Sequence, residues 1–224
     1  MSQPNYALIY FPVHGRAEPI RLLLASLGLP YTEREVTRDT WMSVRPTLPL
    51  GQAPVLVEID ASGHETMVPQ SQAILRHLGR RHGAYGATEA EQLRADVVAE
   101  TVHDVRAVLA PQLAPGVRGK DPAALRATLT EKLPPGLARL ELLHGQGQGD
   151  LFVGARPTWA DCLAFDLLDS LQTVSPTALE AFPGLSRFVA AMRASPGLAT
   201  YLETRRPSEL LPLRRVVETG EALA

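Results

Sequence analysis

The sequence predicts two domains of different class, a small α/β domain followed by an all-α domain. In the first 83 residues, strand-like and helix-like segments alternate in the order β-α-β and then β-β-α. From residue 88 onward the strand patterns stop, and segments rich in Ala, Leu, Arg and Glu are separated by proline or glycine. A chain of 224 residues is also long enough to bury two modest cores. We therefore expect domains at 1–83 and 88–224, joined by a linker at 84–87.

The first domain is predicted to be a small mixed sheet with helices on its faces. A strand, a crossover helix and a second strand imply a parallel pair, to which a hairpin adds antiparallel strands. The hairpin is indicated by "APVLVEID" and "ETMVPQ", which flank the turn-rich residues Asp60–Gly63. In chain order, the predicted elements are a strand at 6–11, a helix at 16–27, an extended segment at 31–36, an irregular stretch containing Trp41 and two prolines, the hairpin, and a helix from Gln70 to Gly83.

The second domain is predicted to contain only helices. In "PTWAD", Thr158 is a suitable N-cap, and Asp161 three residues later can accept from the cap amide, which is a carboxylate form of the capping box. This motif marks the start of a central helix. The helices are expected near 89–114, 120–144, 158–174, 183–194 and 196–206.

Composition excludes several classes of function. Hydrophobic residues make up 45% of the chain and charged residues 21%, and no stretch is apolar for long enough to span a bilayer. The first five residues lack the features of a secretory signal, so we expect a cytoplasmic protein that does not enter a membrane. The net charge is -2 and arginine is spread along the chain without a basic block, so we expect no nucleic acid partner.

The sequence offers little for redox or metal chemistry. The single cysteine, Cys162, lies on what reads as an apolar helix face and is expected to be a buried, inert thiol. Glu100 and His103 have the helical spacing used in di-iron bundles, but such bundles need a second pair of this kind. They also need two further glutamates on facing helices, and the six histidines are scattered along the chain, so we expect no metal and interpret Glu100 and His103 as part of a solvated or interfacial helix face.

Three short motifs suggest chemistry in the first domain. In "YFPVHGRAEPIR", the first strand ends in a phenol, Tyr10, just before a turn. In "GQAPVL", Pro54 precedes a buried strand and is a candidate for a cis peptide that leaves the backbone of Ala53 free to pair with an extended peptide. A proline that merely begins a strand is an equally good interpretation. In "PQSQAILRHL", Gln70 and Ser71 precede a helix whose first amides favour a carboxylate, although Ser71 could simply be an N-cap.

Four motifs together resemble those of the cytosolic glutathione transferases. They are "YFPVHGRAE", "GQAPVL", "QSQAILRHLGR" and "FVGARPTWAD", and the similarity extends over roughly residues 5 to 206. The tyrosine-type classes, Pi and Sigma in particular, are the most similar. The resemblance implies a thioredoxin-like N-terminal domain followed by an all-helical domain. It also implies a homodimeric transferase that uses glutathione as cosubstrate and joins its thiolate to small hydrophobic electrophiles, without a metal.

The resemblance assigns catalytic roles to Tyr10 and Arg16. Tyr10 matches the hydroxyl that donates to the glutathione sulfur, and Arg16 matches a position that adds positive potential near it. The family's glutathione-binding positions fall on Trp41 and Arg45 for the glycine carboxylate, Gln52 as a further contact, Ala53 and a presumed cis Pro54 for the cysteinyl unit, Gln70 and Ser71 for the γ-glutamyl carboxylate, and Asp104, which would reach the γ-glutamyl amine bound to the partner subunit.

The sequence departs from the Pi pattern in three places. The segment between Trp41 and Gln52 is about two residues shorter, which affects the alignment of Arg45. Leu50 stands where the Pi class has an aromatic residue at the dimer edge, and Ala114 stands where that class places a tyrosine beside the substrate. The dimer interface is therefore expected to be softer and the electrophile pocket wider or drier. This pocket is expected to be lined by Phe11, Val13, Ala114 and the tail around Leu210 and Leu211, within a segment, 207–224, whose course the motifs do not define.

Two other functions are compatible with the resemblance. Sigma-like features such as "GRAE" suggest an isomerase or peroxidase that acts on a lipid endoperoxide or hydroperoxide. The same fold also serves as a non-enzymatic ligand-binding or lens-type structural protein, and the joint presence of Tyr10, Arg16, Gln70, Ser71 and Asp104 argues against this role. The electrophile pocket consists of generic apolar residues, so the sequence does not indicate a particular electrophile.

Overall fold

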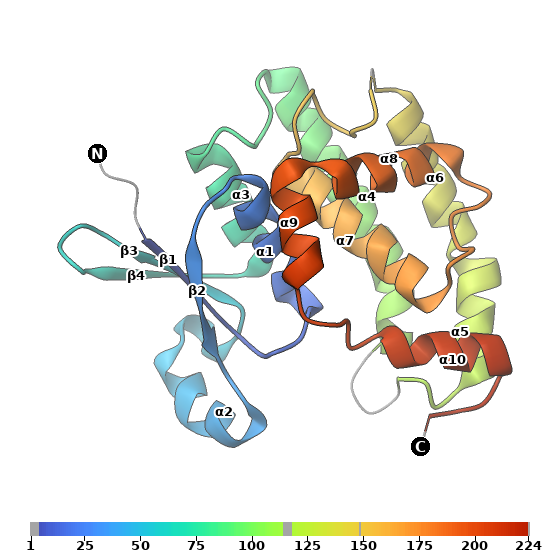
Figure 1. Cartoon of the computed structure of the whole chain (residues 1–224), viewed down its shortest axis with the longest axis horizontal. Coiled ribbons are helices and arrows are strands. Elements are labelled where there is room, and N and C mark those ends of the chain that lie inside the picture. Colours follow the sequence, from blue (N-terminus) through green and yellow to red (C-terminus); the bar gives the residue numbers. More distant parts are fainter. Residues whose placement is uncertain (1–4, 114–117, 148, 224) are drawn as a thin grey trace.

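The computed structural model describes residues 5–113, 118–147 and 149–223. A four-stranded sheet lies on one side of the molecule, and most of the helices form a second body on the other side (Figure 1). The two bodies meet where α1 (Glu18–Ser26) packs against α7 (Trp159–Val174) and α9 (Pro196–Thr204). This is the predicted architecture, a thioredoxin-like domain followed by an all-helical domain. Within the described ranges, no helix is both long and apolar enough to cross a bilayer.

The sheet has the mixed topology that the sequence predicts. Its strands are β1 (Asn5–Tyr10), β2 (Tyr31–Glu35), β3 (Val55–Ile59) and β4 (Glu65–Pro69), in the spatial order β2-β1-β3-β4. The β1 strand pairs parallel with β2 and antiparallel with β3, and β3 pairs antiparallel with β4. The parallel pair follows from the helical crossover, and the antiparallel pair follows from the hairpin.

One helix of the first domain is missing from the sequence-based prediction. The stretch around Trp41, expected to be irregular, contains α2 (Arg38–Val44). Thr37 begins this helix with a capping box, in which Thr37 and Thr40 each accept from the other's backbone amide. None of its residues is fully buried, and only Trp41 and Val44 pack against the core, so its apolar stripe is too short for sequence periodicity to detect. The predicted helix after β4 is α3 (Ser71–Arg81).

The second domain contains the predicted helices with one break and one addition. The helix expected at 120–144 is interrupted by a π-helical turn at Thr128–Lys132, because Pro134 and Pro135 lack the amide hydrogens that a continuous ladder needs. The tail forms a further helix that ends at Gly220, which has a left-handed φ of 73°. These helices are α4 (Glu89–Leu113), α5 (Pro122–Ala127), α6 (Pro134–Gly145), α7, α8 (Pro183–Ala194), α9 and α10 (Leu211–Thr219).

The central helix α7 begins with the predicted capping box. Asp161 is fully buried and accepts from the backbone amides of Thr158 and Phe152, each at 2.9 Å. Burial raises the pKa of this carboxyl to about 6, although the hydrogen bonds oppose the shift. Cys162 on the same helix is buried, as expected from the sequence, and burial raises the pKa of its thiol well above the ordinary value, which is consistent with an unreactive thiol.

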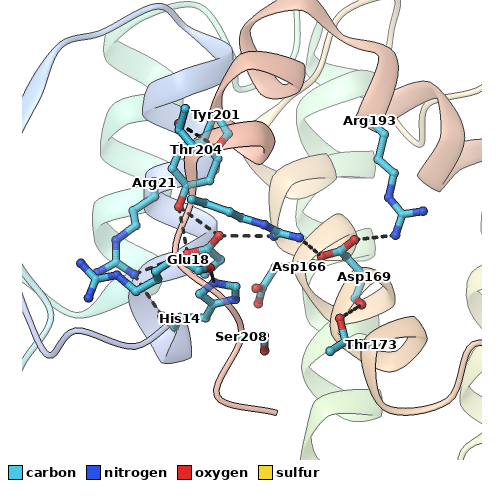
Figure 2. Close-up of polar contacts among 12 residues, drawn as sticks. His14, Glu18, Arg21, Asp166, Asp169, Thr173, Arg193, Tyr201, Thr204 and Ser208 are labelled. Carbon is cyan, nitrogen blue, oxygen red and sulfur yellow. Dashed lines mark hydrogen bonds and ion pairs between the residues drawn. The ribbon is translucent and has the colours of Figure 1, made fainter. Parts of the chain in front are cut away.

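A buried ionic network joins the two domains (Figure 2). Glu18 in α1 is fully buried and accepts from the Tyr201 hydroxyl in α9 at 3.0 Å. Arg205 lies 3.5 Å from Glu18 and 2.6 Å from Asp169 in α7, and Arg193 in α8 lies 2.6 Å from the other oxygen of Asp169. Each buried carboxylate has a cationic partner, which offsets the cost of its desolvation. The network fixes the positions of α1, α7 and α9 relative to one another, beside the site described below.

Candidate active site

The ends of three strands bring the predicted chemical groups together. Tyr10 is the last residue of β1, Pro54 immediately precedes β3, and Gln70 immediately follows β4. Ile9 pairs with Val55, and Val55 pairs with Pro69. Because these pairings are antiparallel, the end of β1, the start of β3 and the end of β4 lie at the same edge of the sheet. The three sequence motifs therefore meet, as the sequence analysis expects.

The Tyr10 hydroxyl is held in an orientation that leaves its proton available. Its side chain is buried, and its oxygen accepts the backbone amide of Arg16 at 3.0 Å. A phenol oxygen that accepts one hydrogen bond keeps its own O–H for a second partner. Burial is the largest influence on the pKa of Tyr10 and raises it, while the Arg16 amide and side chain oppose the shift. The hydroxyl is thus a neutral hydrogen-bond donor at physiological pH.

The turn after β1 approaches Tyr10 so closely that it requires a glycine. Gly15 has a left-handed φ of 44°, and a Cβ at this position would lie 2.5 Å from the Tyr10 oxygen. Any side chain here would push the ring away. The turn Gly15–Ala17 is a short 3₁₀ helix that leads directly into α1 and places the amide of Arg16 on the phenol.

Tyr10 faces a cavity of about 880 Å³ that lies between the two domains. Its wall combines residues from the turn after β1 and from α2 with residues from α4, α7 and the tail. A space of this volume suits a small organic molecule, and most of its wall is apolar. The lining residues are Tyr10, Phe11, Val13, His14, Gly15, Arg16, Arg38, Trp41, Arg106, Leu109, Ala110, Leu113, Arg118, Asp166, Leu167, Ser170, Glu209 and Leu210.

Six of the predicted residues line this cavity: Tyr10, Phe11, Val13, Arg16, Trp41 and Leu210. The Trp41 ring lies against that of Phe11, with the two centroids 5.3 Å apart. The tail contributes Leu210 as expected, whereas Leu211, also named from the sequence, lies outside the cavity lining and is 51% exposed. Ala114, the remaining predicted pocket residue, lies outside the described residues.

Five other glutathione-binding candidates, Gln52, Ala53, Pro54, Gln70 and Ser71, lie just before β3 or just after β4, at the edge of the sheet where β1 ends. The Ala53–Pro54 peptide is cis, which confirms that part of the prediction. Gln70 Nε2 lies 3.3 Å from Gln52 Oε1, and both side chains are exposed. The N-cap of α3 is Gln70, whose φ is 71°, and Ser71 is the first helical residue. The alternative interpretation of Ser71 as the N-cap is therefore wrong.

The two remaining candidates, Arg45 and Asp104, lie outside the residues that line the cavity. Arg45 is exposed at the start of the 3₁₀ turn Arg45–Thr47, and a Cβ on Gly51 would lie 3.5 Å from its Nε atom. Asp104 is exposed on α4 and lies outside the residues that line the cavity. Its helix face also carries Leu93 and Val97, whose exposed fractions are 66% and 43%. Residues 93, 97 and 104 share a face because they are separated by four and seven positions.

Sequence reasoning missed five charged residues that line the cavity: Arg38, Arg106, Arg118, Asp166 and Glu209. Asp166 accepts from Arg106 at 2.8 Å, and burial raises its pKa to about 6 although Arg106 opposes the shift. A signal for Asp166 existed, since this acid interrupts the apolar run "LAFDLL" of a buried helix. For Glu209 there was none, because it contacts a turn 194 residues earlier in the chain.

The site can act as a neutral hydrogen-bond donor toward an anion at the edge of an apolar cavity. A carboxylate or thiolate beside Tyr10 would also lie near Arg16, which adds a favourable charge. In the described parts of the chain, no group of three or more His, Cys, Asp or Glu side chains could hold a metal ion.

Comparisons with known proteins agree with this geometry. Residues 6–80 match the model of the glutathione S-transferase N-terminal domain, and residues 103–205 match that of its C-terminal domain. A "Glutathione S-transferase P" of Caenorhabditis elegans is 36% identical over 201 residues, which are 88% of this chain and 92% of the relative. A "Glutathione S-transferase" of Anopheles gambiae is 34% identical over 92% of this chain and its own full length.

A solved structure supports the same conclusion. The sigma class enzyme of Fasciola hepatica superposes with a TM-score of 0.83 at 29% identity, and the match covers 92% of this chain and 99% of that chain. The sequence identity, the matched domain models and the shared fold together show that the chain belongs to the glutathione S-transferase family.

Proposed function

We propose that this protein joins the thiolate of glutathione to small hydrophobic electrophiles, as an alkyl or aryl transferase. The observation that supports this most strongly is the Tyr10 hydroxyl. It is neutral, it already accepts the Arg16 amide, and it faces an apolar cavity. The transferase names of the curated relatives favour conjugation over an isomerase or a non-enzymatic role.

Tyr10 acts by stabilising the thiolate of bound glutathione. A free thiol has a pKa near ~8.5, so only a few per cent is ionised at neutral pH. A hydrogen bond to an ionised group contributes about 1.5–3 kcal/mol, and about 1.4 kcal/mol corresponds to one pKa unit. One phenol therefore lowers the thiol pKa by about 1–2 units, which raises the ionised fraction at neutral pH from a few per cent to roughly a quarter to three quarters.

The thiolate then attacks an electrophilic carbon held in the cavity. The sulfur lone pair forms a new carbon–sulfur bond, and in an aryl halide the carbon–halogen bond breaks with loss of halide. In an enone the electrons move to the oxygen, and the adduct takes a proton from water. The enzyme contributes an ionised nucleophile and its orientation toward the electrophile.

Glutathione is proposed to bind along the edge of the sheet beside Tyr10. The backbone of Ala53, a partly buried residue, can pair with the cysteinyl unit, and the first amides of α3, at Gln70 and Ser71, favour the γ-glutamyl carboxylate. Trp41 and Arg45, with Gln52, are the proposed contacts at the glycine end. Arg16 adds positive charge near the sulfur.

The enzyme is proposed to be a homodimer with shared sites. Leu93 and Val97 form an exposed apolar strip on α4, and Asp104 lies on the same helix face. Leu50, 69% exposed at the end of the turn before β3, is a second apolar contact. When two copies bury this strip, Asp104 of one copy can approach the amine of glutathione bound to the other.

The substrate class is tested by assaying purified enzyme with glutathione against aryl halides, enones, isothiocyanates, hydroperoxides and a prostaglandin endoperoxide. We expect glutathione-dependent adducts with the first three classes, at rates well above the uncatalysed reaction. Turnover of the endoperoxide or hydroperoxides alone would show that the enzyme is an isomerase or peroxidase instead. Absence of any turnover, with glutathione bound, would contradict an enzymatic role.

A further inference from the structure

The turn that holds Tyr10 is capped by a residue from the far end of the chain. His14 is the N-cap of the 3₁₀ turn Gly15–Ala17, but its side chain makes no capping hydrogen bond. Instead, Glu209 Oε2 accepts the His14 amide at 3.0 Å, and Glu209 Oε1 accepts the Gly15 amide at 3.1 Å. The amides at the start of a helical segment have no partner within it, and a carboxylate is the strongest acceptor for them.

Further contacts hold the tail in this position. The ring of His14 is buried, and its Nε2 lies 2.8 Å from the carbonyl oxygen of Arg206. Arg206 pairs with Glu35 at the end of β2 at 2.5 Å, and Arg118 donates to the carbonyl oxygen of Glu209 at 3.2 Å. Glu209 is therefore anchored from the sheet and from the helical domain, so its carboxylate is held in place beside the turn.

The capped turn is the one that orients the catalytic phenol. Glu209 accepts a hydrogen bond from the Gly15 amide. The next amide in the chain, that of Arg16, donates to the Tyr10 oxygen at 3.0 Å. Gly15 also lies directly against the phenol oxygen. A rotation of the His14–Gly15 peptides would move the Arg16 amide off the oxygen and release the hydroxyl to other orientations.

We propose that Glu209 is a positioning residue: by capping the His14–Gly15 turn, it keeps the Arg16 amide on Tyr10 and the hydroxyl proton directed at the glutathione sulfur. This inference rests on the proposed role of Tyr10. The direction of the change in the thiol pKa is informative, because the negative charge of Glu209 and its capping of the turn have opposite effects on that pKa. A negative charge near the site disfavours a thiolate, whereas a well-oriented hydroxyl favours it.

Other charges surround the same groups and stay constant in the experiment. Arg16 and Arg21 lie near the phenol, and both lower its pKa, whereas Glu209 raises it. The remaining charged or titratable residues that line the cavity are His14, Arg38, Arg106, Arg118 and Asp166.

The test compares the pKa of bound glutathione in Glu209→Ala, Glu209→Gln and the wild type, from the ultraviolet absorbance of the thiolate and from the pH dependence of kcat/KM. We expect Glu209→Ala to raise this pKa by about half a unit to one unit, a three- to tenfold fall in the ratio of thiolate to thiol. Glu209→Gln keeps one accepting oxygen and should give a smaller rise. Glu218→Ala, which removes an exposed carboxylate paired with Arg214 in α10, should leave the pKa unchanged.

A double-mutant comparison separates this inference from the role of Tyr10 itself. In the Tyr10→Phe background, Glu209→Ala should no longer raise the pKa, because the positioning effect acts through the hydroxyl and only the removal of a negative charge, which lowers the thiol pKa, remains. An unchanged or lowered pKa in Glu209→Ala, with the fold intact by circular dichroism, would show a structural or purely electrostatic role and overturn the proposal. If Tyr10→Phe alone has no effect on the pKa, the proposed function of Tyr10 fails instead.

Discussion

At the scale of single residues, the site depends on close contacts that side-chain chemistry alone does not reveal. The position of Tyr10 was predictable, because a strand that ends in a phenol before a glycine turn is a local pattern, whereas its role was implied by the family resemblance. The burial of Cys162 was predictable for the same reason, since its helix face is apolar. Asp166 was missed although it interrupts an apolar run, whereas Glu209 could not be predicted, because its position follows from contact with a turn 194 residues earlier. The family motifs indicate the donor, while Glu209 beside it depends on the tertiary structure.

Gly15 provides a test of the contact at Tyr10. In Gly15→Ala, the new methyl would lie 2.5 Å from the phenol oxygen, so the ring must move and its hydrogen bond to Arg16 must weaken. We expect kcat/KM to fall at least about tenfold, equivalent to roughly 1.4 kcal/mol of transition-state stabilisation.

Gly28→Ala is the matched control for this substitution. Gly28 has a similar left-handed φ of 63°, but nothing lies within 4 Å of a Cβ at its position. Backbone strain should cost each variant about 1 kcal/mol of stability, and the clash with Tyr10 should make the fall in Tm larger for Gly15→Ala. Equal kcat/KM values in the two variants would show that the contact between Gly15 and Tyr10 does not matter for catalysis.

At the scale of elements, the sequence predicts those that have a strong local signal. The strands, α1, α3 and α7 were predicted because alternation, helical periodicity or a capping box marks each of them. The surface helix α2 lacks buried residues, and its only marker is a threonine capping box. The π-helical turn at Thr128–Lys132 was not predicted, because the periodicity on both sides is helical and only the following prolines signal the change.

The proposed subunit interface includes one face of helix α4. Replacing both Leu93 and Val97 by glutamate puts two charges on this exposed apolar strip, so the subunits should separate. Sedimentation equilibrium should show the mass of a dimer for the wild type and half of that mass for the variant. Because Asp104 would then lack its partner site, we expect glutathione affinity to fall about tenfold, or roughly 1.4 kcal/mol.

Two comparisons keep this prediction specific. Leu142→Glu, at a residue of α6 that is 64% exposed, changes a similar side chain elsewhere and should leave the dimer intact. Asp104→Ala should weaken glutathione binding without separating the subunits. A wild-type protein that is monomeric, or a monomeric variant with normal affinity for glutathione, would be inconsistent with shared sites.

At the scale of the whole molecule, the cavity exists because two domains are locked together. The order of elements and the change of composition near residue 88 were enough to predict the division into two domains. The way in which the domains meet could not be predicted, because it depends on Glu18 and Asp169, two acids that a sequence pattern would assign to the surface. Both are buried at the junction (Figure 2) and are neutralised by arginines from distant segments. The junction fixes α1 and the tail on either side of the turn that orients Tyr10.

The central claim is that this assembly holds a neutral hydroxyl on the glutathione sulfur. The most direct measurement is the ultraviolet titration of glutathione bound to the wild type and to Tyr10→Phe, with binding measured separately by calorimetry. We predict nearly unchanged affinity and a rise of about 1–2 units in the pKa of the bound thiol when the hydroxyl is removed. The same pKa in both proteins would contradict the claim.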